Sequence, residues 1–240
     1  MKITIIGAGT MGKIFKKSLP KGKVTIIDKA DKTPDSDVYI FAVKPQDFKK
    51  AAERLKGVKG KILISIMAGV PISTITKELP GNKIIRSMPN LGSRTGDGMT
   101  VWKSKGKFTP AQSKLIKNIF SSIGAELEVK KEDLLDVAVA VAGSGPGYIY
   151  HIAASMTKTA NQLGFSKKDA ELLVKQTLKG SSEVWLAAKE TSAEELEKQV
   201  TSKKGTTDAA IKTFKKHKLS QTISKGIKAA YARAKELSKL

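Results

Sequence analysis

A glycine-rich hexamer near the amino terminus constrains the fold of this chain more than any other feature. Residues 7–12 read GAGTMG and directly follow residues 2–6, a short run rich in β-branched apolar side chains. Such a run is typical of a buried parallel strand. A stretch that suits a helix comes next, followed by a second apolar run at residues 24–27 and then Asp28. The order strand, glycine turn, helix, strand and acid predicts a dinucleotide-binding site rather than a glycine-rich turn with no ligand.

Each glycine of the hexamer meets a different requirement of such a site. Gly7 permits a tight turn, Gly9 lets the backbone approach a pyrophosphate, and Gly12 lets the helix pack closely on the strand. The amino terminus of the helix then presents free N–H groups to the phosphates. We therefore predict that the whole hexamer binds the cofactor: Gly7, Ala8, Gly9, Thr10, Met11 and Gly12.

Two adjacent residues bear on the choice of cofactor, and they favour different cofactors. Asp28 lies 21 residues after Gly7, where a carboxylate can hold a ribose 2′-hydroxyl and would repel a 2′-phosphate, which favours NADH. Lys29 could neutralise that phosphate and permit NADPH. The predicted cofactor is therefore NADPH or NADH, and both residues are predicted to bind it.

The chain changes from alternating strands and helices to helices alone. Residues 29–37 contain a proline and are too few for a normal crossover helix. Beyond about residue 131, apolar residues recur at helical spacing. Further strands are expected at 38–43, 61–66, 84–85 and 99–102, and helices at 134–141, 149–163, 168–186 and 223–237. The pattern predicts an α/β Rossmann-type nucleotide-binding domain at residues 1–128, followed by an all-α domain at residues 129–240.

An uncharged stretch at residues 137–157 is long enough to suggest a membrane span. Three glycines and a proline at residues 143–147 interrupt it. We therefore expect two buried helices separated by a break, and no membrane span.

The formal charge of +22, the difference between 44 cations and 22 anions, first suggests a nucleic-acid partner. Only four of the cations are arginines, and the lysines are scattered without a basic block. We interpret the charge as a solvated, lysine-rich surface or as a field that draws small anions to a cleft, and expect no nucleic-acid partner.

The chain has no cysteine and two histidines, so we expect no metal site. No secretory signal is evident, and a cytoplasmic location is expected.

Six short segments, in order along nearly the whole chain, resemble motifs of the pyrroline-5-carboxylate reductase family. They are GAGTMG at 7–12, FAVKPQ at 41–46, SIMAGV at 65–70, RSMPN at 86–90, GSGPGY at 143–148 and VTSKKGTT at 200–207. The resemblance implies NAD(P)H-dependent reduction of the cyclic imine 1-pyrroline-5-carboxylate to L-proline. It also implies that the all-α C-terminal domain is a dimerisation domain, which forms a homodimer or a higher homo-oligomer.

The resemblance further implies which residues line the site. The implied cofactor contacts beyond the hexamer, Asp28 and Lys29 are Ala42, Val43, Lys44, Pro45, Ala68, Gly69 and Asn90. The implied substrate contacts are Ser144, Gly145, Glu190, Ser202, Gly205, Thr206 and Thr207. Thr207 is the candidate catalytic, proton-handling residue, because a family hydroxyl at its position lies near the ring nitrogen. Glu190 is equally well interpreted as a solvated helix-end acid, and Thr206 or Thr207 as a helix cap.

Departures from the family pattern leave other functions open. Lys203 and Lys204 stand where the family has Pro-Gly, and they could hold a substrate carboxylate or mark a changed substrate. Leu91-Gly92 replaces a frequent Thr-Pro, and Ala142 replaces a serine. The alternatives are another imine or β-hydroxyacid-type NAD(P) oxidoreductase, and a non-enzymatic dinucleotide-binding regulator. The β-hydroxyacid enzymes usually rely on a catalytic lysine in a region where this chain has the GSGPGY segment.

Overall fold

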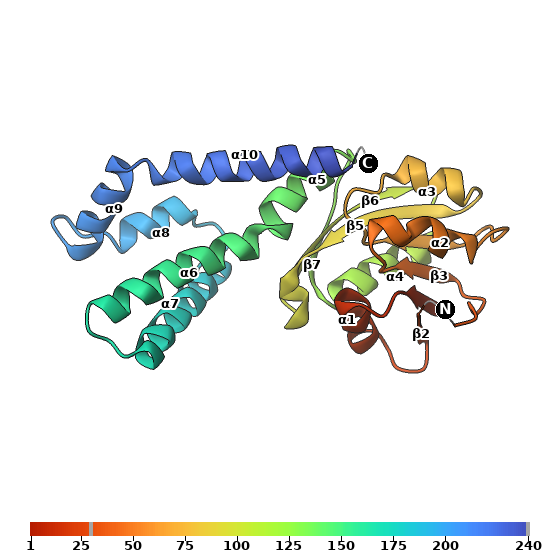
Figure 1. Cartoon of the computed structure of the whole chain (residues 1–240), viewed down its shortest axis with the longest axis horizontal. Helices are drawn as coiled ribbons and strands as arrows, with labels where there is room; N and C mark the ends of the chain where they lie inside the picture. Colours follow the sequence, from red (N-terminus) through yellow and green to blue (C-terminus); the bar gives the residue numbers. More distant parts are fainter. Residues whose placement is uncertain (29–30, 239–240) are drawn as a thin grey trace. The chain divides into compact units, whose positions relative to one another are not determined.

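Two compact units make up the computed structural model, which describes residues 1–28 and 31–238. The sheet unit comprises residues 1–146 and the chain from Lys228 onward, and the helical unit comprises residues 147–227. The predicted fold class, a Rossmann-type α/β part followed by helices, is confirmed (Figure 1). The predicted boundary between functional domains at residues 128 and 129 stays a prediction. Lys29, predicted to bind the cofactor, lies outside the described residues.

Seven strands form the sheet of the first unit, in the order β2-β1-β3-β4-β5-β6-β7. Their bounds are Ile3–Ile6 (β1), Val24–Ile27 (β2), Val38–Phe41 (β3), Ile62–Ser65 (β4), Lys83–Pro89 (β5), Gly98–Lys105 (β6) and Gly124–Glu128 (β7). β6 runs antiparallel to β5, and all other neighbours are parallel. From β1 the chain passes to β2 on one side and then to β3 on the other side, so the strand order reverses between β1 and β3. Ligands of open α/β sheets bind at the carboxyl ends of the strands at such a point, which is where the glycine hexamer lies.

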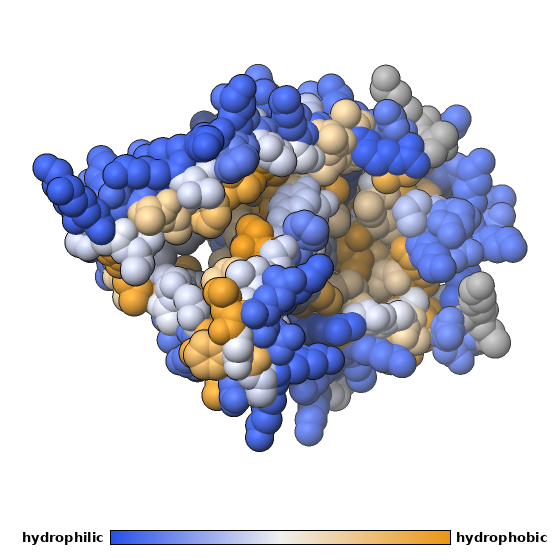
Figure 2. Space-filling model, turned by 60° about the vertical axis from the view of Figure 1, so that its left-hand side comes forward, coloured by the Kyte–Doolittle hydropathy of each residue, from blue (hydrophilic) through white to orange (hydrophobic). Residues whose placement is uncertain are grey.

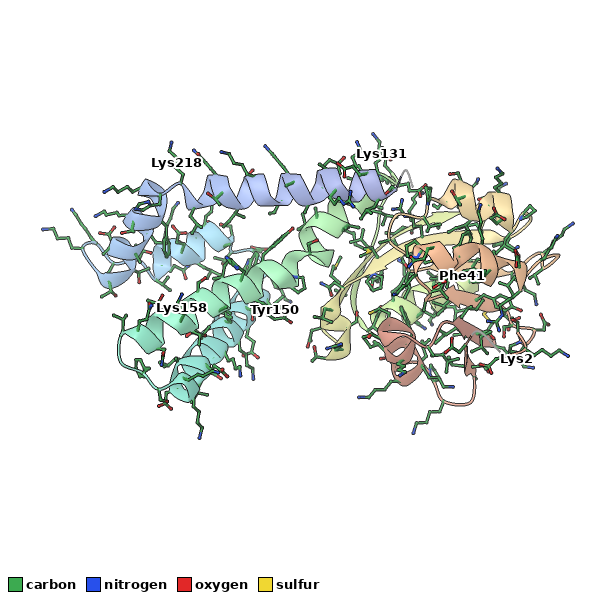
Figure 3. The ribbon with its side chains drawn as sticks, viewed as in Figure 1. Lys2, Phe41, Lys131, Tyr150, Lys158 and Lys218 are labelled. Atoms are coloured by element: carbon green, nitrogen blue, oxygen red, sulfur yellow. The ribbon has the colours of Figure 1, made fainter. Side chains whose placement is uncertain are left out.

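Helices cover both faces of this sheet and bury its apolar side chains in two cores. The bounds are Thr10–Ser18 (α1), Phe48–Glu53 (α2), Ile72–Glu78 (α3), Pro110–Ser121 (α4) and Leu134–Ala138 (α5), with short 3-10 turns at Pro45–Asp47 (η1) and Leu91–Arg94 (η2). α1 and α4 cover one face, where Phe120 is fully buried. α2 and α3 cover the other, where the rings of Phe41 (labelled in Figure 3) and Phe48 meet edge to face at 5.5 Å. Because consecutive strand residues point to opposite faces, each of the strands β1 to β5 contributes to both cores and holds the loops at its ends.

Polar side chains hold the connection from β2 to β3. The ten residues 28–37 pass from one side of β1 to the other, fewer than the dozen or so usual for a parallel crossover. Thr4 Oγ1 and Ser36 Oγ are hydrogen-bonded at 2.7 Å. The Tyr39 hydroxyl accepts from the Ser36 N–H (2.9 Å) and donates to the Pro34 carbonyl (3.1 Å). As predicted, the described part of this connection contains no helix.

One strand was not predicted from the sequence. β7 reads GAELE and lies at the edge of the sheet, paired in parallel with β6. None of its described residues is buried, and Leu127 is 51% exposed. An edge strand of this kind lacks the apolar run by which the other strands are recognised.

From α5 onward, the chain contains the four predicted helices and two more. After α5, the bounds are Gly145–Gln162 (α6), Lys167–Ala187 (α7), Ala193–Gln199 (α8), Thr206–Lys216 (α9) and Leu219–Leu237 (α10). α10 begins among residues of the helical unit and ends among residues of the sheet unit. Among the described residues, no helix is both long enough and apolar enough to cross a membrane.

The predicted break at residues 143–147 is shorter than expected, because only Ser144 separates the two helical elements. Val139–Gly143 form a π-helical turn (η3), and α6 begins at Gly145. Pro146 lies in the first turn of α6, where a residue without an N–H is tolerated. The expected burial is found in part of the first helix, where Ala138 and Ala140 are buried, but it is wrong for α6 within the single chain: no residue of α6, all of which is described, is buried, and Tyr150 is 60% exposed. The apolar residues of α6 therefore lie at the surface of the chain.

Candidate active site

The glycine hexamer forms the tight turn from β1 into α1. Gly7 has a φ of +113°, and a Cβ added there would lie 2.5 Å from the carbonyl oxygen of Ala42, beyond the end of β3. A Cβ at Gly12 would collide with the Gly7 carbonyl oxygen. Both glycines are thus required by close backbone approach, as the sequence pattern indicates.

The amino terminus of α1 is open around Gly9. This residue is the N-cap of the helix, and within the described structure no side chain caps it. A Cβ added at Gly9 would meet no atom within 4 Å. The N–H groups of the first turn, beginning at Thr10 and Met11, can therefore receive an anion. The arrangement fits the pyrophosphate of a dinucleotide.

A cavity of about 190 Å³ lies beside this turn and brings together three predicted cofactor residues, Gly7, Asp28 and Val43. Sites that enclose a whole small ligand usually measure about 300–1,000 Å³, so this cavity suits one part of a dinucleotide. Because it joins the hexamer to Asp28 at the end of β2, its position fits the ribose that carries the 2′-position. Its other wall is formed by Lys50 and Arg54 of the α2 segment, which the sequence analysis did not identify.

The loops after β3 and β4 extend the same edge of the sheet. The Ala42 N–H donates to the Ile6 carbonyl at 2.8 Å, so the predicted segment 42–45 starts next to the hexamer. The loop 66–71 carries Ala68 and Gly69 and is held at its start by Ser65, whose Oγ accepts from the Met67 N–H at 3.2 Å. A Cβ at Gly69 would lie 2.8 Å from the Leu237 carbonyl oxygen, so the end of α10 packs directly on this loop.

A buried ionic cluster supports the far end of loop 66–71. Arg86, 5% exposed, donates from Nη1 to Glu132 Oε1 (3.0 Å) and from Nη2 to Asp136 Oδ1 (2.9 Å). Glu132 Oε1 also accepts from the Ile72 N–H at 2.9 Å, where α3 begins. Ser238 Oγ donates to Asp136 Oδ1 at 3.2 Å. The cluster therefore ties β5, α3, α5 and the end of α10 together beside the loop.

Asn90, at the end of the RSMPN segment, binds the residue that precedes the GSGPGY segment. Its Nδ2 donates to the Ala142 carbonyl at 3.0 Å, and its Oδ1 accepts from the Met99 N–H at 3.0 Å. Ser144 and Gly145 follow directly, at the junction of η3 and α6. The structure therefore brings Asn90 close to the segment that contains these two predicted substrate residues, and their roles toward ligands stay predictions.

The predicted substrate loop lies within the helical unit, before α9. The Gly205 N–H donates to the Ser202 carbonyl at 2.9 Å, and a Cβ at Gly205 would collide with Ser202 Oγ. Gly205 is itself the N-cap of α9, without a side-chain cap among the described residues, so the interpretation of Thr206 or Thr207 as the cap is wrong. The first N–H groups of α9 are thus available to an anion.

Charged groups surround this loop. Lys204 has a left-handed backbone, with a φ of +62°, and its N–H donates to Asp208 Oδ2 at 3.1 Å. Asp208 also accepts from Lys212 Nζ at 2.7 Å, and that hydrogen bond lowers the pKa of the Asp208 carboxyl. Glu190 is exposed in the turn between α7 and α8, and neither interpretation of it is tested.

Known proteins share this arrangement over nearly the whole chain. A pyrroline-5-carboxylate reductase of Staphylococcus haemolyticus is 34% identical over 208 residues, 85% of this chain and 76% of that protein. The solved structure of a pyrroline-5-carboxylate reductase from Coxiella burnetii has a TM-score of 0.91 at 32% identity and covers 100% of this chain and 99% of its own. The chain belongs to the pyrroline-5-carboxylate reductase family. A pyrroline carboxylate reductase of Plasmodium falciparum, solved with NADP bound, has a TM-score of 0.87 at 25% identity, covering 99% of this chain and 98% of its own.

Two family descriptions match parts of this reductase. The one described as "Pyrroline-5-carboxylate reductase dimerisation" matches residues 132–237, and the one described as "NADP oxidoreductase coenzyme F420-dependent" matches residues 16–69. The first spans α5 to α10, so the chain forms a homo-oligomer through this region. Among the described residues, no three His, Asp or Glu side chains are grouped so as to hold a metal ion.

Five charged residues of this reductase were missed by the sequence analysis. They are Lys50, Arg54, Arg86, Glu132 and Asp136. Arg86 could have been suspected, because a charged residue interrupts the apolar run of β5 and a buried charge needs partners. The other four have no recognisable local sequence pattern, because their roles depend on contacts with residues far away in the sequence.

Proposed function

We propose that this protein reduces 1-pyrroline-5-carboxylate to L-proline with NADPH or NADH as the hydride donor. The observation that carries the proposal is the open amino terminus of α1 at the switch point of the sheet, in a chain of this family. The helical region serves as the dimerisation domain, and the protein acts in the cytoplasm as a homodimer or a higher homo-oligomer.

The cofactor is held by the loops at the carboxyl ends of the parallel strands. The N–H groups after Gly9 bind the pyrophosphate, and Asp28 binds the adenosine ribose. The segments 42–45 and 66–71 lie beside the nicotinamide, because they follow β3 and β4 on the opposite side of the switch point. When bound, the dinucleotide supplies a hydride to the imine carbon.

The substrate carboxylate is held at the start of α9. Its partners are the N–H groups that follow Gly205 and the hydroxyls of Ser202 and Thr206, strengthened by the positive end of the helix dipole. No arginine is needed for such an anion site. Ser144 and Gly145 complete the substrate contacts, and Glu190 faces the substrate nitrogen.

The protein itself has little covalent chemistry to perform. A protonated cyclic imine is already a strong electrophile, so most of the rate comes from holding both reactants close and aligned. Thr207 holds the proton at the ring nitrogen, and the residue is half-buried in the first turn of α9. This reaction suits a chain without cysteine and with few histidines.

The direct test mixes the purified protein with 1-pyrroline-5-carboxylate and NADPH or NADH, and follows the loss of nicotinamide absorbance together with the appearance of proline. Turnover with at least one cofactor is expected. Binding of both dinucleotides without any turnover would favour the regulator alternative.

A variant pair locates the proton-handling group. Thr207→Ala should lower kcat by about a hundredfold or more, the usual range for general acid–base catalysis, while Thr207→Ser retains most of it. Thr213→Ala is the matched control, because Thr213 lies exposed on the same helix and its Oγ1 bonds the Ala209 carbonyl. An equal loss of kcat in the two alanine variants would remove Thr207 from catalysis.

A further inference from the structure

Two cationic side chains from one short helical segment line the cavity beside Asp28. Lys50 belongs to α2 and Arg54 to its carboxyl end, four residues apart, so they share a face of the helix. Asp28 and Asp47 also line the cavity, so its charges are two positive and two negative. Which of these groups meets a ligand depends on what else each one binds.

Arg54 is occupied by the β2–β3 connection. Its Nε donates to Thr33 Oγ1 at 3.1 Å, its Nη1 donates to the Asp28 carbonyl at 2.9 Å, and its Nη2 donates to the Asp31 carbonyl. The guanidinium thus fixes the backbone of Asp28. Asp31 adds a second constraint, because its Oδ2 accepts from the Asp28 N–H at 2.7 Å. Arg54 therefore acts on a ligand through Asp28.

Lys50 is exposed and lines the same cavity. Within residues 1–28 and 31–238, the structure records no hydrogen bond or ion pair of its ammonium group. A lysine on a flexible stem is a phosphate binder that acts as a point charge. Of the two cations on this wall, Lys50 is thus the one that can turn to a phosphate placed next to Asp28.

We propose that Lys50 is the specificity-determining residue that admits the 2′-phosphate of NADPH, and that Arg54 is a positioning residue that holds Asp28 for the 2′-hydroxyl of NADH. The inference rests on the proposed use of NAD(P)H. It assigns part of the discrimination to the α2 segment, whose residues line the cavity together with Asp28.

Direct binding titrations of the full-length protein test this inference. The probes are NADPH, NADH, and the fragments adenosine 2′-monophosphate and adenosine 5′-monophosphate. Lys50→Met should raise the Kd of NADPH and of the 2′-monophosphate by about tenfold, the usual effect of losing a hydrogen bond to a charged group, and that of NADH by less than about twofold. Arg54→Met should raise the Kd of NADH more than that of NADPH. The ratio of the two Kd values therefore moves in opposite directions, which a general loss of structure would not cause.

Two further variants control the result. Lys49→Met removes an equally exposed lysine from the same helix that does not line the cavity, and should leave both Kd values unchanged. Arg54→Lys should recover part of the affinity for NADH. Equal weakening of both cofactors by Lys50→Met, or the same selective effect from Lys49→Met, would overturn the inference. The titrations contain no pyrroline-5-carboxylate, so absent turnover would contradict the proposed function and leave the assignment of Lys50 standing.

Discussion

The sheet unit and the helical unit bury their apolar residues in different ways. In the sheet unit, Phe15, Phe41 and Phe120 are fully buried by the helices that cover the sheet. In the helical unit, all of whose residues are described, α8 and α9 have no buried residue, and Trp185 is 55% and Leu186 81% exposed. Figure 2 shows such apolar patches at the surface. One unit completes its own core, whereas the other leaves apolar surface for a second copy of the chain.

The largest effect is expected in the core of the sheet unit. Phe120→Ala removes a fully buried ring between α4 and the sheet and should cost about 3–5 kcal/mol of unfolding free energy. Chemical denaturation at several protein concentrations measures it. The loss of unfolding free energy should not depend on protein concentration. A loss that depends on concentration would contradict the view that the sheet unit completes its core within one chain.

A smaller effect is expected for an apolar residue of the helical unit. Trp185→Ala should weaken association by about 2 kcal/mol, the size typical of an aromatic hot spot. Because Trp185 is exposed in the single chain, its removal should change the unfolding free energy of the isolated chain little. Sedimentation or light scattering over a dilution series would show the shift toward monomer. Lys189→Ala, in the turn after α7, serves as an exposed control. Unchanged assembly would show that another part of the helical unit forms the interface.

Backbone strain distinguishes the units as well. Among the described residues, every left-handed position of the sheet unit is a glycine, whereas the helical unit has Lys204 (φ +62°) and Lys218 (φ +56°), the latter labelled in Figure 3. Lys204→Gly and Lys218→Gly should each stabilise the fold by about 0.5–1 kcal/mol, because glycine adopts this conformation without a Cβ clash. Thermal or chemical denaturation measures the gain. Lys203→Gly, at a position without positive φ, should give no gain, and a gain there would contradict the explanation.

The smallest effect is electrostatic, and each unit contains one example. A hydrogen bond from Lys61 lowers the pKa of Asp35 in the sheet unit, and one from Lys212 lowers that of Asp208 in the helical unit. Each lowered pKa favours the folded state above the unfolded value near 3.8 and loses that contribution as the pH falls through the folded value. In NMR titrations, Lys61→Met should raise only the pKa of Asp35, and Lys212→Met only that of Asp208. A change in both carboxyls would imply coupling between the units.

The same contrast explains what could be predicted from the sequence. The strands, the glycine turn and Asp28 follow from local patterns, because period and spacing determine them. The burial expected for α6 was predicted wrongly, because apolar periodicity does not distinguish a core within one chain from a surface shared by two. Lys50 and Glu132 could not be assigned, because their roles depend on contacts with residues 22 and 46 or more positions away. Polar side chains can pair over such distances only once the chain has folded.

The packing of Leu237 on Gly69 has a consequence for synthesis on the ribosome. The sheet unit is interrupted by the 81 residues 147–227, so its last contacts form only after the whole helical unit has been translated. At roughly 5–20 residues per second, that delay is about 4–16 s. During this time the loop 66–71 and the acids that pair with Arg86 are present without the end of α10. The nascent sheet is thus complete except for the packing of the end of α10 on loop 66–71, which forms last at the loop that we propose lies beside the nicotinamide.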